Sequence, residues 1–207
     1  VTVLDEVDYQ TALGVNEFVG AFSWYFPDYF HEIDIDFRYL INRPSKIKNR
    51  VGVFFSGGVD SLFVLWHILH KNTYFNKEHT ELWLIPVIGM DLIHKDVIDL
   101  VLSSANDIAE SVGAKVLPLI SNVKEVSLAD DTFDWQYHAH GVAKAACAMA
   151  LKNQFDFICV GASSPYGEIV PEGSMPRTDE LWRTNDFQLY HVGATRSRLG
   201  KIRDMAN

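Results

Sequence analysis

Apolar and polar positions repeat with two different periods along this chain, and the change of period marks its elements. Short apolar runs rich in Val, Ile, Leu and Phe occupy 51–55, 81–88, 114–120 and 155–160. Runs of this length are typical of strands buried on both faces of a parallel sheet. Between them, apolar residues recur at helical spacing over 62–69, 95–112 and 138–152. Gly113 follows the second of these segments and is suited to end a helix.

The predicted elements alternate as β-α-β-α-β-α-β, which indicates an α/β protein with a Rossmann-like, doubly wound parallel sheet. The chain has 207 residues, of which 48% are hydrophobic, enough for one core. We assign residues 51–207 to this domain. Residues 1–50 form an aromatic-rich N-terminal extension expected to pack on it, with an edge strand predicted over 32–37 from the alternation there.

A glycine pair lies between the first predicted strand and the first predicted helix, in Ser56-Gly-Gly-Val-Asp-Ser61. Gly57 and Gly58 can adopt positive φ, so successive backbone N–H groups can point into one concavity. The N-terminus of the following helix also favours an anion. Asp60 would repel a polyphosphate unless a divalent cation lay between them, so it suggests a Mg²⁺ site. The alternative is a tight turn of small residues.

This stretch resembles the PP-loop of the ATP pyrophosphatase superfamily, whose fold is called adenine nucleotide alpha hydrolase-like. Relatives include the GMP, NAD and asparagine synthetases and the 7-cyano-7-deazaguanine synthases. All six positions of Ser-Gly-Gly-x-Asp-Ser match at 56–61. Neither a Gly-x-x-x-x-Gly-Lys-Ser/Thr loop nor a Gly-x-Gly-x-x-Gly loop after a strand is present.

The resemblance implies ATP as the nucleotide and Mg²⁺ held by Asp60. It implies catalytic roles for Ser56 and Asp60. A third catalytic role is expected for Arg196, which would meet pyrophosphate or a substrate acid and belongs to a late basic cluster of Arg177, Arg183, Arg196, Arg198, Lys201 and Arg203. Nucleotide contacts are expected from the loop and from the ends of the strands around it: Phe54, Phe55, Ser56, Gly57, Gly58, Val59, Asp60, Ser61, Val87, Gly89, Met90, Gly161 and Ala162. Glu168, Asp91 and the acidic residues Asp130, Asp131 and Asp134 are further options, with helix capping or a solvated loop as the alternatives.

The implied reaction starts when an oxygen of a small-molecule substrate attacks the α-phosphate of ATP and pyrophosphate leaves. An amine, ammonia or sulfur donor then displaces AMP. Cys147 and Cys159 lie in apolar surroundings without Cys-x-x-Cys spacing, so we expect buried thiols and favour amidation or ligation by an AMP-forming enzyme. Two alternatives stay open: a non-catalytic adenine-nucleotide-binding or regulatory subunit, and sulfur transfer or RNA modification.

Charge and hydropathy restrict the partners. The net charge is −9 and no basic run is present, which disfavours a nucleic acid. No apolar run reaches membrane-spanning length and no signal-like segment opens the chain, so a cytoplasmic protein is expected. A homo-oligomer, or a partner subunit that supplies a nitrogen donor or a missing C-terminal part, stays open.

The late segment carries a second pattern, Gly-Ser-x-Pro-x-x-Asp-x-Leu-Trp, from Gly173 to Trp182. It is similar to uncharacterised PP-loop proteins in which a cysteine-containing tail follows. The chain stops at Asn207, so we expect that such a tail is lacking. The segment 173–198 shows little periodicity and is predicted to be a binding lid or a partner surface.

Overall fold

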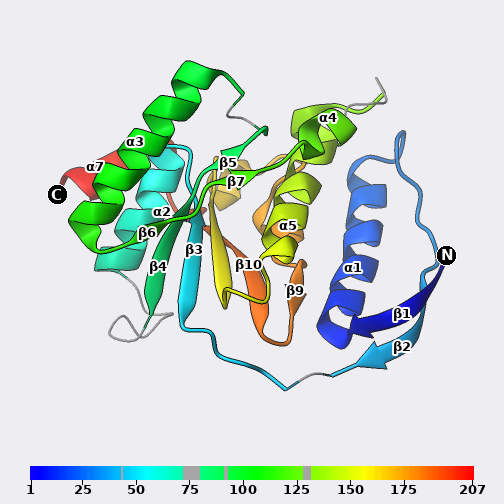
Figure 1. Ribbon diagram of the computed structural model, residues 1–207. Helices are drawn as coiled ribbons and strands as arrows, with labels where there is room; N and C mark the ends of the chain where they lie inside the picture. The colour runs from blue at the N-terminus through cyan, green and yellow to red at the C-terminus, as the bar shows by residue number, and fades with distance from the viewer. Residues whose placement is uncertain (43, 72–79, 91–92, 128–131) are drawn as a thin grey trace.

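A parallel sheet forms the centre of the computed structural model, which describes residues 1–42, 44–71, 80–90, 93–127 and 132–207 (Figure 1). The strand order is β6-β4-β3-β8-β10-β9. The strands are β3 (Arg50–Phe54), β4 (Glu81–Ile85), β6 (Lys115–Val116), β8 (Phe157–Gly161), β9 (Arg183–Thr184) and β10 (Phe187–Val192). All neighbours are parallel except β9 and β10. The predicted fold class is confirmed.

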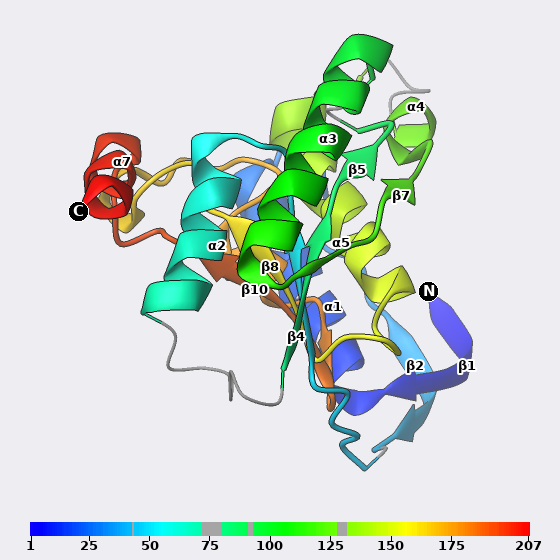
Figure 2. The ribbon, with the colours of Figure 1, turned by 60° about the vertical axis from the view of Figure 1, so that its left-hand side comes forward.

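Helices cover both faces of this sheet (Figures 1 and 2). On one face, α2 (Val59–His70) and α3 (Lys95–Val112) pack on Val51, Val53 and neighbouring residues, and α7 (Arg198–Ala206) packs on α2. On the other face, α5 (His140–Ala150) packs on Phe54 and its neighbours. Successive β3 residues therefore point into two different cores, as expected for a strand buried on both faces. Within the described residues, no helix is long and apolar enough to cross a membrane.

Two prolines divide the second and third predicted strands. Pro86 separates β4 from β5 (Val87–Ile88), and Pro118 separates β6 from β7 (Leu119–Ile120). Proline has no N–H to donate to a sheet, so the ladder breaks at each position. β5 and β7 then pair with each other in parallel as a separate two-stranded sheet. The helix predicted over 95–112 is confirmed, and Gly113 ends it with a φ of 70°.

The prediction that 173–198 is little structured is wrong. This segment contains α6 (Pro176–Asp179), the hairpin strand β9 and the central strand β10. β10 pairs with β8 from Gln188 to Val192 and thereby becomes the fifth parallel strand. Phe187 and Leu189 lie in the core on one face of the sheet and Tyr190 and Val192 in the core on the other, so β10 is buried on both faces.

The N-terminal extension is a β-α-β unit of β1 (Thr2–Asp8), α1 (Tyr9–Tyr25) and β2 (Asp36–Ile41). β1 and β2 pair in parallel, with Thr2 opposite Asp36, so the predicted strand over 32–37 is wrong in its bounds. Helix α1 lies against β9 at the edge of the main sheet (Figure 1). There Thr11 Oγ1 donates to the carbonyl oxygen of Arg183 at 2.9 Å, and the ring centroid of Phe18 is 5.0 Å from that of Trp182.

Candidate functional site

Two glycines and two serines determine the conformation of the loop between β3 and α2. Gly57 has a φ of 74°, a conformation that side chains other than glycine rarely adopt, and Gly58 is the N-cap of α2. Ser61 Oγ donates to the carbonyl oxygen of Gly58 at 2.9 Å and lies 3.4 Å from Ser56 Oγ. The two hydroxyls thus hold the loop against the first turn of the helix, where the backbone N–H groups favour an anion.

Gly161 allows the end of β8 to touch the first turn of α2. A Cβ at this position would lie 2.7 Å from both the carbonyl carbon and the carbonyl oxygen of Asp60. Real Cβ atoms do not approach backbone so closely. Glycine at the carboxyl end of β8 is therefore required by the position of the loop helix.

Asp60 is held by two cations from the C-terminal helix. Lys201 Nζ lies 2.7 Å from Asp60 Oδ1, and Arg198 lies 2.8 Å from Oδ2. The Lys201 side chain is completely buried and also donates to the carbonyl oxygen of Ala162. Ser197 starts α7 by accepting a hydrogen bond from the N–H of Gly200, so residues 198 and 201 share one helix face.

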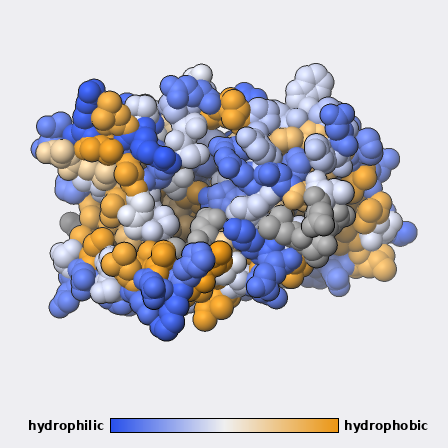
Figure 3. Space-filling view, turned by 90° about the horizontal axis from the view of Figure 1, so that it is seen from above, coloured by the Kyte–Doolittle hydropathy of each residue, from blue (hydrophilic) through white to orange (hydrophobic). Residues whose placement is uncertain are grey.

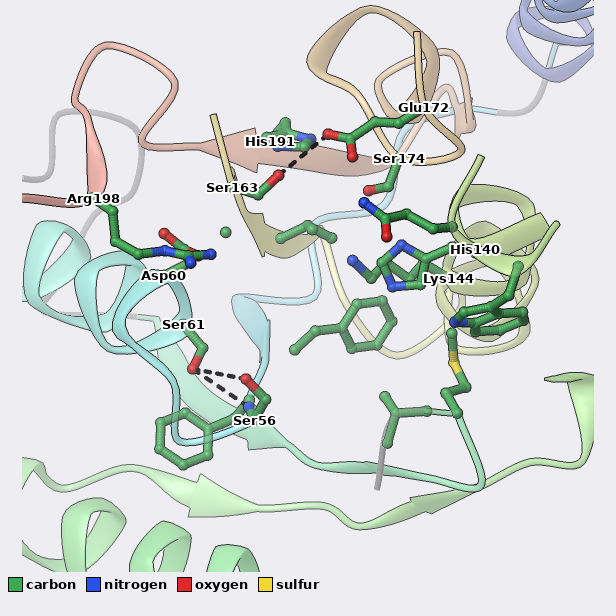
Figure 4. Close-up of a pocket in the computed structure, with 18 residues that line it drawn as sticks. Ser56, Asp60, Ser61, His140, Lys144, Ser163, Glu172, Ser174, His191 and Arg198 are labelled. Atoms are coloured by element: carbon green, nitrogen blue, oxygen red, sulfur yellow. Dashed lines mark hydrogen bonds and ion pairs between the residues drawn. The ribbon is translucent and has the colours of Figure 1, made fainter. Parts of the chain in front are cut away.

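A cavity of about 400 Å³ opens beside this loop, at the carboxyl ends of the strands, where ligands bind in open α/β sheets. In Figure 4, Asp60 and Arg198 lie on one side of it, and His140 and Lys144 lie opposite. Seen from above, Figure 3 shows hydrophilic residues over the middle of this face and apolar residues toward its sides. The apolar part of the lining consists of Phe54, Phe55, Val87, Met90, Trp135 and Val160.

The wall opposite the loop comes from η1 (Trp135–Ala139), a single π-helical turn, and from α5. Trp135 and Gln136 of η1 line the cavity. His138 of the same turn is buried and lies between aromatic rings of the N-terminal extension, with its ring centroid 5.0 Å from that of Phe26 and 4.4 Å from that of Tyr29. π-turns of this kind occur often at functional sites. This turn connects the cavity wall to the N-terminal extension.

The structure gathers most of the expected contact residues around the cavity. Eight of them line it: Phe54, Phe55, Ser56, Asp60, Ser61, Val87, Met90 and Gly161. Five others shape the backbone nearby without appearing in the lining: Gly57, Gly58, Val59, Gly89 and Ala162. Gly89 has a φ of 89°, and a Cβ there would lie 1.9 Å from the carbonyl oxygen of Ser121. Glu168 and Asp134 do not line the cavity, and Asp134 instead caps η1 by accepting a hydrogen bond from the N–H of Tyr137. Asp91, Asp130 and Asp131 lie outside the described residues.

Arg196 is not part of the lining. Its Nε lies 3.0 Å from Asp204 Oδ2, and its side chain is half exposed. Arg198, which is two residues further along the chain, lines the cavity instead and contacts Asp60. The sequence placed Arg198 and Lys201 in the late basic cluster without singling them out, and it assigned His140 to a helix N-terminal turn. Lys144 and His191, which also line the cavity, were not identified. The sequence signal for Arg198 and Lys201 was their spacing of three residues directly after Ser197, a good N-cap residue.

The two cysteines are buried, as expected. Burial raises the pKa of the Cys147 thiol and raises that of Cys159 to about 12. Both side chains are therefore protonated at neutral pH, and neither lines the cavity. Within the described ranges, no group of three or more His, Cys, Asp or Glu residues could hold a metal ion.

Comparison with known proteins gives a distant structural likeness. No family model matches the chain, and no curated protein matches it. Among solved structures, the U34-tRNA thiolase NcsA from Methanococcus maripaludis, which has a 4Fe-4S cluster, is similar with a TM-score of 0.40 and 16% identity. The match covers 72% of this chain and 46% of that protein. A likeness this distant bears on neither ligand nor activity.

Proposed function

We propose that this protein binds ATP and transfers AMP to a small-molecule substrate with release of pyrophosphate, after which an amine or ammonia displaces AMP. The observation that carries the proposal is that three features line one cavity. They are the glycine-serine loop at the N-terminus of α2, Arg198 of α7, and an apolar wall. The phosphates would lie on the loop from Ser56 to Ser61. The adenosine would lie against Phe54, Val87 and Met90.

Charge neutralisation is the main contribution of the protein to the first step. Backbone N–H groups of the loop, the Ser56 hydroxyl and Arg198 would stabilise the negative charge that develops on the departing pyrophosphate, whereas the Ser61 hydroxyl donates to the carbonyl oxygen of Gly58 and holds the loop in place. We assign this role to Arg198 in place of Arg196, because only Arg198 lines the cavity. No covalent nucleophile on the protein is needed.

Asp60 fits the carboxylate expected at a Mg²⁺ site. Magnesium commonly takes one or two carboxylates together with substrate phosphates, so a single carboxylate at the loop suffices. Bound there, the ion would supply positive charge next to the phosphates. Both Asp60 oxygens are paired with cations, but the Arg198 side chain is 61% exposed whereas that of Lys201 is 0% exposed. Arg198 is therefore the partner that can move from Asp60 to a phosphate.

The opposite wall suits the acceptor substrate. Lys144 and His140 both line the cavity across from the loop (Figure 4). A cationic side chain there favours an acceptor that carries a carboxylate. Sulfur transfer is less well supported, because both cysteines are buried, protonated and outside the lining. A nucleotide-binding subunit without turnover is the alternative that binding experiments alone would not exclude.

The test is calorimetric titration of ATP, AMP and pyrophosphate, each with Mg²⁺, into four proteins. These are the wild type, Ser56→Ala, Asp60→Asn and the control Asp107→Asn, which makes the same chemical change on an exposed part of α3. We expect ATP and pyrophosphate to bind at least about tenfold more weakly to both loop variants, because each loses a polar interaction of about 1.4 kcal/mol or more. AMP should be affected less, and the control should match the wild type.

Thermal unfolding of each variant separates binding from folding, because Asp60→Asn leaves buried Lys201 without its carboxylate. Ser56→Ala keeps that ion pair and so retains a clear result if Asp60→Asn does not fold. Absence of ATP binding to the wild type would overturn the proposal. Release of AMP from ATP with a panel of carboxylic acids and ammonia then distinguishes an enzyme from a binding subunit.

A further inference from the structure

A buried polar cluster of Ser174, Asp179 and His191 lies on the cavity wall. Ser174 Oγ donates to Asp179 Oδ2 at 2.7 Å, and His191 Nδ1 lies 3.1 Å from the same oxygen. The three residues are between 1% and 8% exposed. Ser174 and His191 both contribute to the cavity lining that also contains the phosphate loop (Figure 4).

The Gly173–Trp182 pattern is what builds this cluster. Gly173 N–H donates to the carbonyl oxygen of Gln136 at 2.9 Å, and a Cβ on Gly141 would lie 1.6 Å from the carbonyl oxygen of Gly173. Pro176 stands at the start of α6, where its missing N–H is tolerated, and the N–H of Asp179 donates to the carbonyl oxygen of Met175. The segment is thereby locked against η1 and α5, and its serine and aspartate are aimed at β10.

Asp179 determines which nitrogen of His191 carries the proton. Asp179 Oδ2 already accepts a hydrogen bond from Ser174, so we assign Nδ1 of His191 as the second donor to this oxygen. The neutral imidazole then keeps a lone pair on Nε2. Asp179 Oδ1 is buried and has no hydrogen-bond partner among the described residues. Burial of an incompletely satisfied carboxylate is costly, and such groups are concentrated at functional sites.

The order of contacts excludes an activated serine. In a serine hydrolase the histidine accepts the proton of the serine hydroxyl. Here Ser174 donates to Asp179 instead, so its hydroxyl supports the carboxylate. Of this cluster, the imidazole of His191 is the group left for chemistry in the cavity.

We propose that His191 is the general base of the second half-reaction and that Asp179 is its positioning residue, an inference that rests on the proposed function. The lone pair of the incoming amine forms the new bond to the carbonyl carbon of the acyl adenylate. The bond from that carbon to the phosphate oxygen breaks, and its electron pair leaves with AMP. The proton lost by the amine goes to Nε2 of His191 and from there to solvent. The substrate class is therefore a carboxylic acid that is joined to an amine or ammonia.

The tautomer of His191 tests this assignment without any nucleotide. Long-range ¹H–¹⁵N correlation spectra of the ¹⁵N-labelled full chain report which ring nitrogen carries the proton. His191→Gln assigns the signals by removing them from those of the 8 histidines. We expect protonated Nδ1 and unprotonated Nε2 in the wild type. Asp179→Asn should transfer the proton to Nε2, because the amide can donate to Nδ1. Ser174→Ala, which keeps the carboxylate, should leave the wild-type tautomer.

The nucleophile position is tested with AMP and hydroxylamine, a small amine that is largely uncharged at neutral pH. With AMP bound, hydroxylamine should shift the Nε2 signal in the wild type and in Ser174→Ala, and this shift should be lost in Asp179→Asn. Protonated Nε2 in the wild type, an unchanged tautomer in Asp179→Asn, or an Nε2 signal that ignores hydroxylamine would each overturn the role of His191. Failure of ATP to bind the wild type is a separate result, which overturns the proposed function.

Discussion

Gly161→Ala tests the close contact between the end of β8 and the phosphate loop. The new Cβ would lie 2.7 Å from the carbonyl carbon and oxygen of Asp60, about 0.7 Å short of ordinary contact at 3.4 Å. Both obstructing atoms are backbone in the first turn of α2, so no side chain can rotate away. Either β8 or the start of α2 must move by several tenths of an ångström.

This movement should have two measurable effects, a loss of folding stability and a loss of ATP binding or turnover. Overpacking of a well-packed interior destabilises a protein by about 1–3 kcal/mol. Misplacement of positioning groups by about 1 Å reduces rates by about 10²-fold, so a shift somewhat smaller than this should weaken ATP binding or turnover by roughly 10–100-fold. Urea unfolding measures the first quantity, and calorimetric titration with Mg²⁺ and ATP measures the second.

Gly20→Ala is the matched control. It adds the same methyl group within α1, where a Cβ would meet nothing within 4 Å. Alanine is favoured over glycine inside a helix, so this variant should be about 0.5–1 kcal/mol more stable and should bind ATP normally. If Gly161→Ala binds ATP like the control, the loop does not depend on its contact with β8, and the reasoning is refuted.

Three further predictions concern burial. Phe22→Ala should lower the free energy of unfolding by about 3–5 kcal/mol, because this 3% exposed ring packs on Phe18; a urea midpoint close to that of the wild type would contradict it. Burial raises the pKa of Glu180, so the folded chain keeps this proton to higher pH than the unfolded chain, and ionisation costs stability as pH rises. Glu180→Gln should therefore raise the unfolding free energy at pH 7, with the gain vanishing below about pH 4.5, the ordinary value; an equal gain at both pH values would count against it. Cys147 and Cys159 should resist iodoacetamide in the folded protein and react in urea, as mass spectrometry would show; rapid native alkylation would refute their burial.

The sequence was most informative where a chemical motif lies between elements with a clear hydrophobic periodicity. The glycine pair between a buried strand and an amphipathic helix located the loop, because both neighbours show clear periodicity. Strand β10 was missed because its pattern is short and includes His191, a polar residue that lines the cavity. Residues that serve a site break the periodicity by which a strand is recognised.

Other parts of the site depend on geometry that no local pattern contains. The late basic residues could be recognised as a cluster, but the choice of Arg198 over Arg196 depends on the start of α7 at Ser197. The pairing of Ser174 and Asp179 with His191 needs β10 beside β8, which is a property of the whole sheet. The extra residue of the η1 turn also has no simple sequence signal.

That η1 turn makes the site sensitive to chain length as well as to side chains. Trp135 and Gln136 face the cavity while His138, in the same turn, stays among the rings of the N-terminal extension. An α-helix rotates by about 100° per residue, so removing one residue from 135–139 to restore α-helical winding would turn these side chains relative to one another. The two sets of contacts could not then both persist. Substitutions in this turn would alter single contacts, whereas a one-residue deletion would disconnect the cavity wall from the N-terminal extension, so natural variants should tolerate changes of residue type here more readily than changes in length.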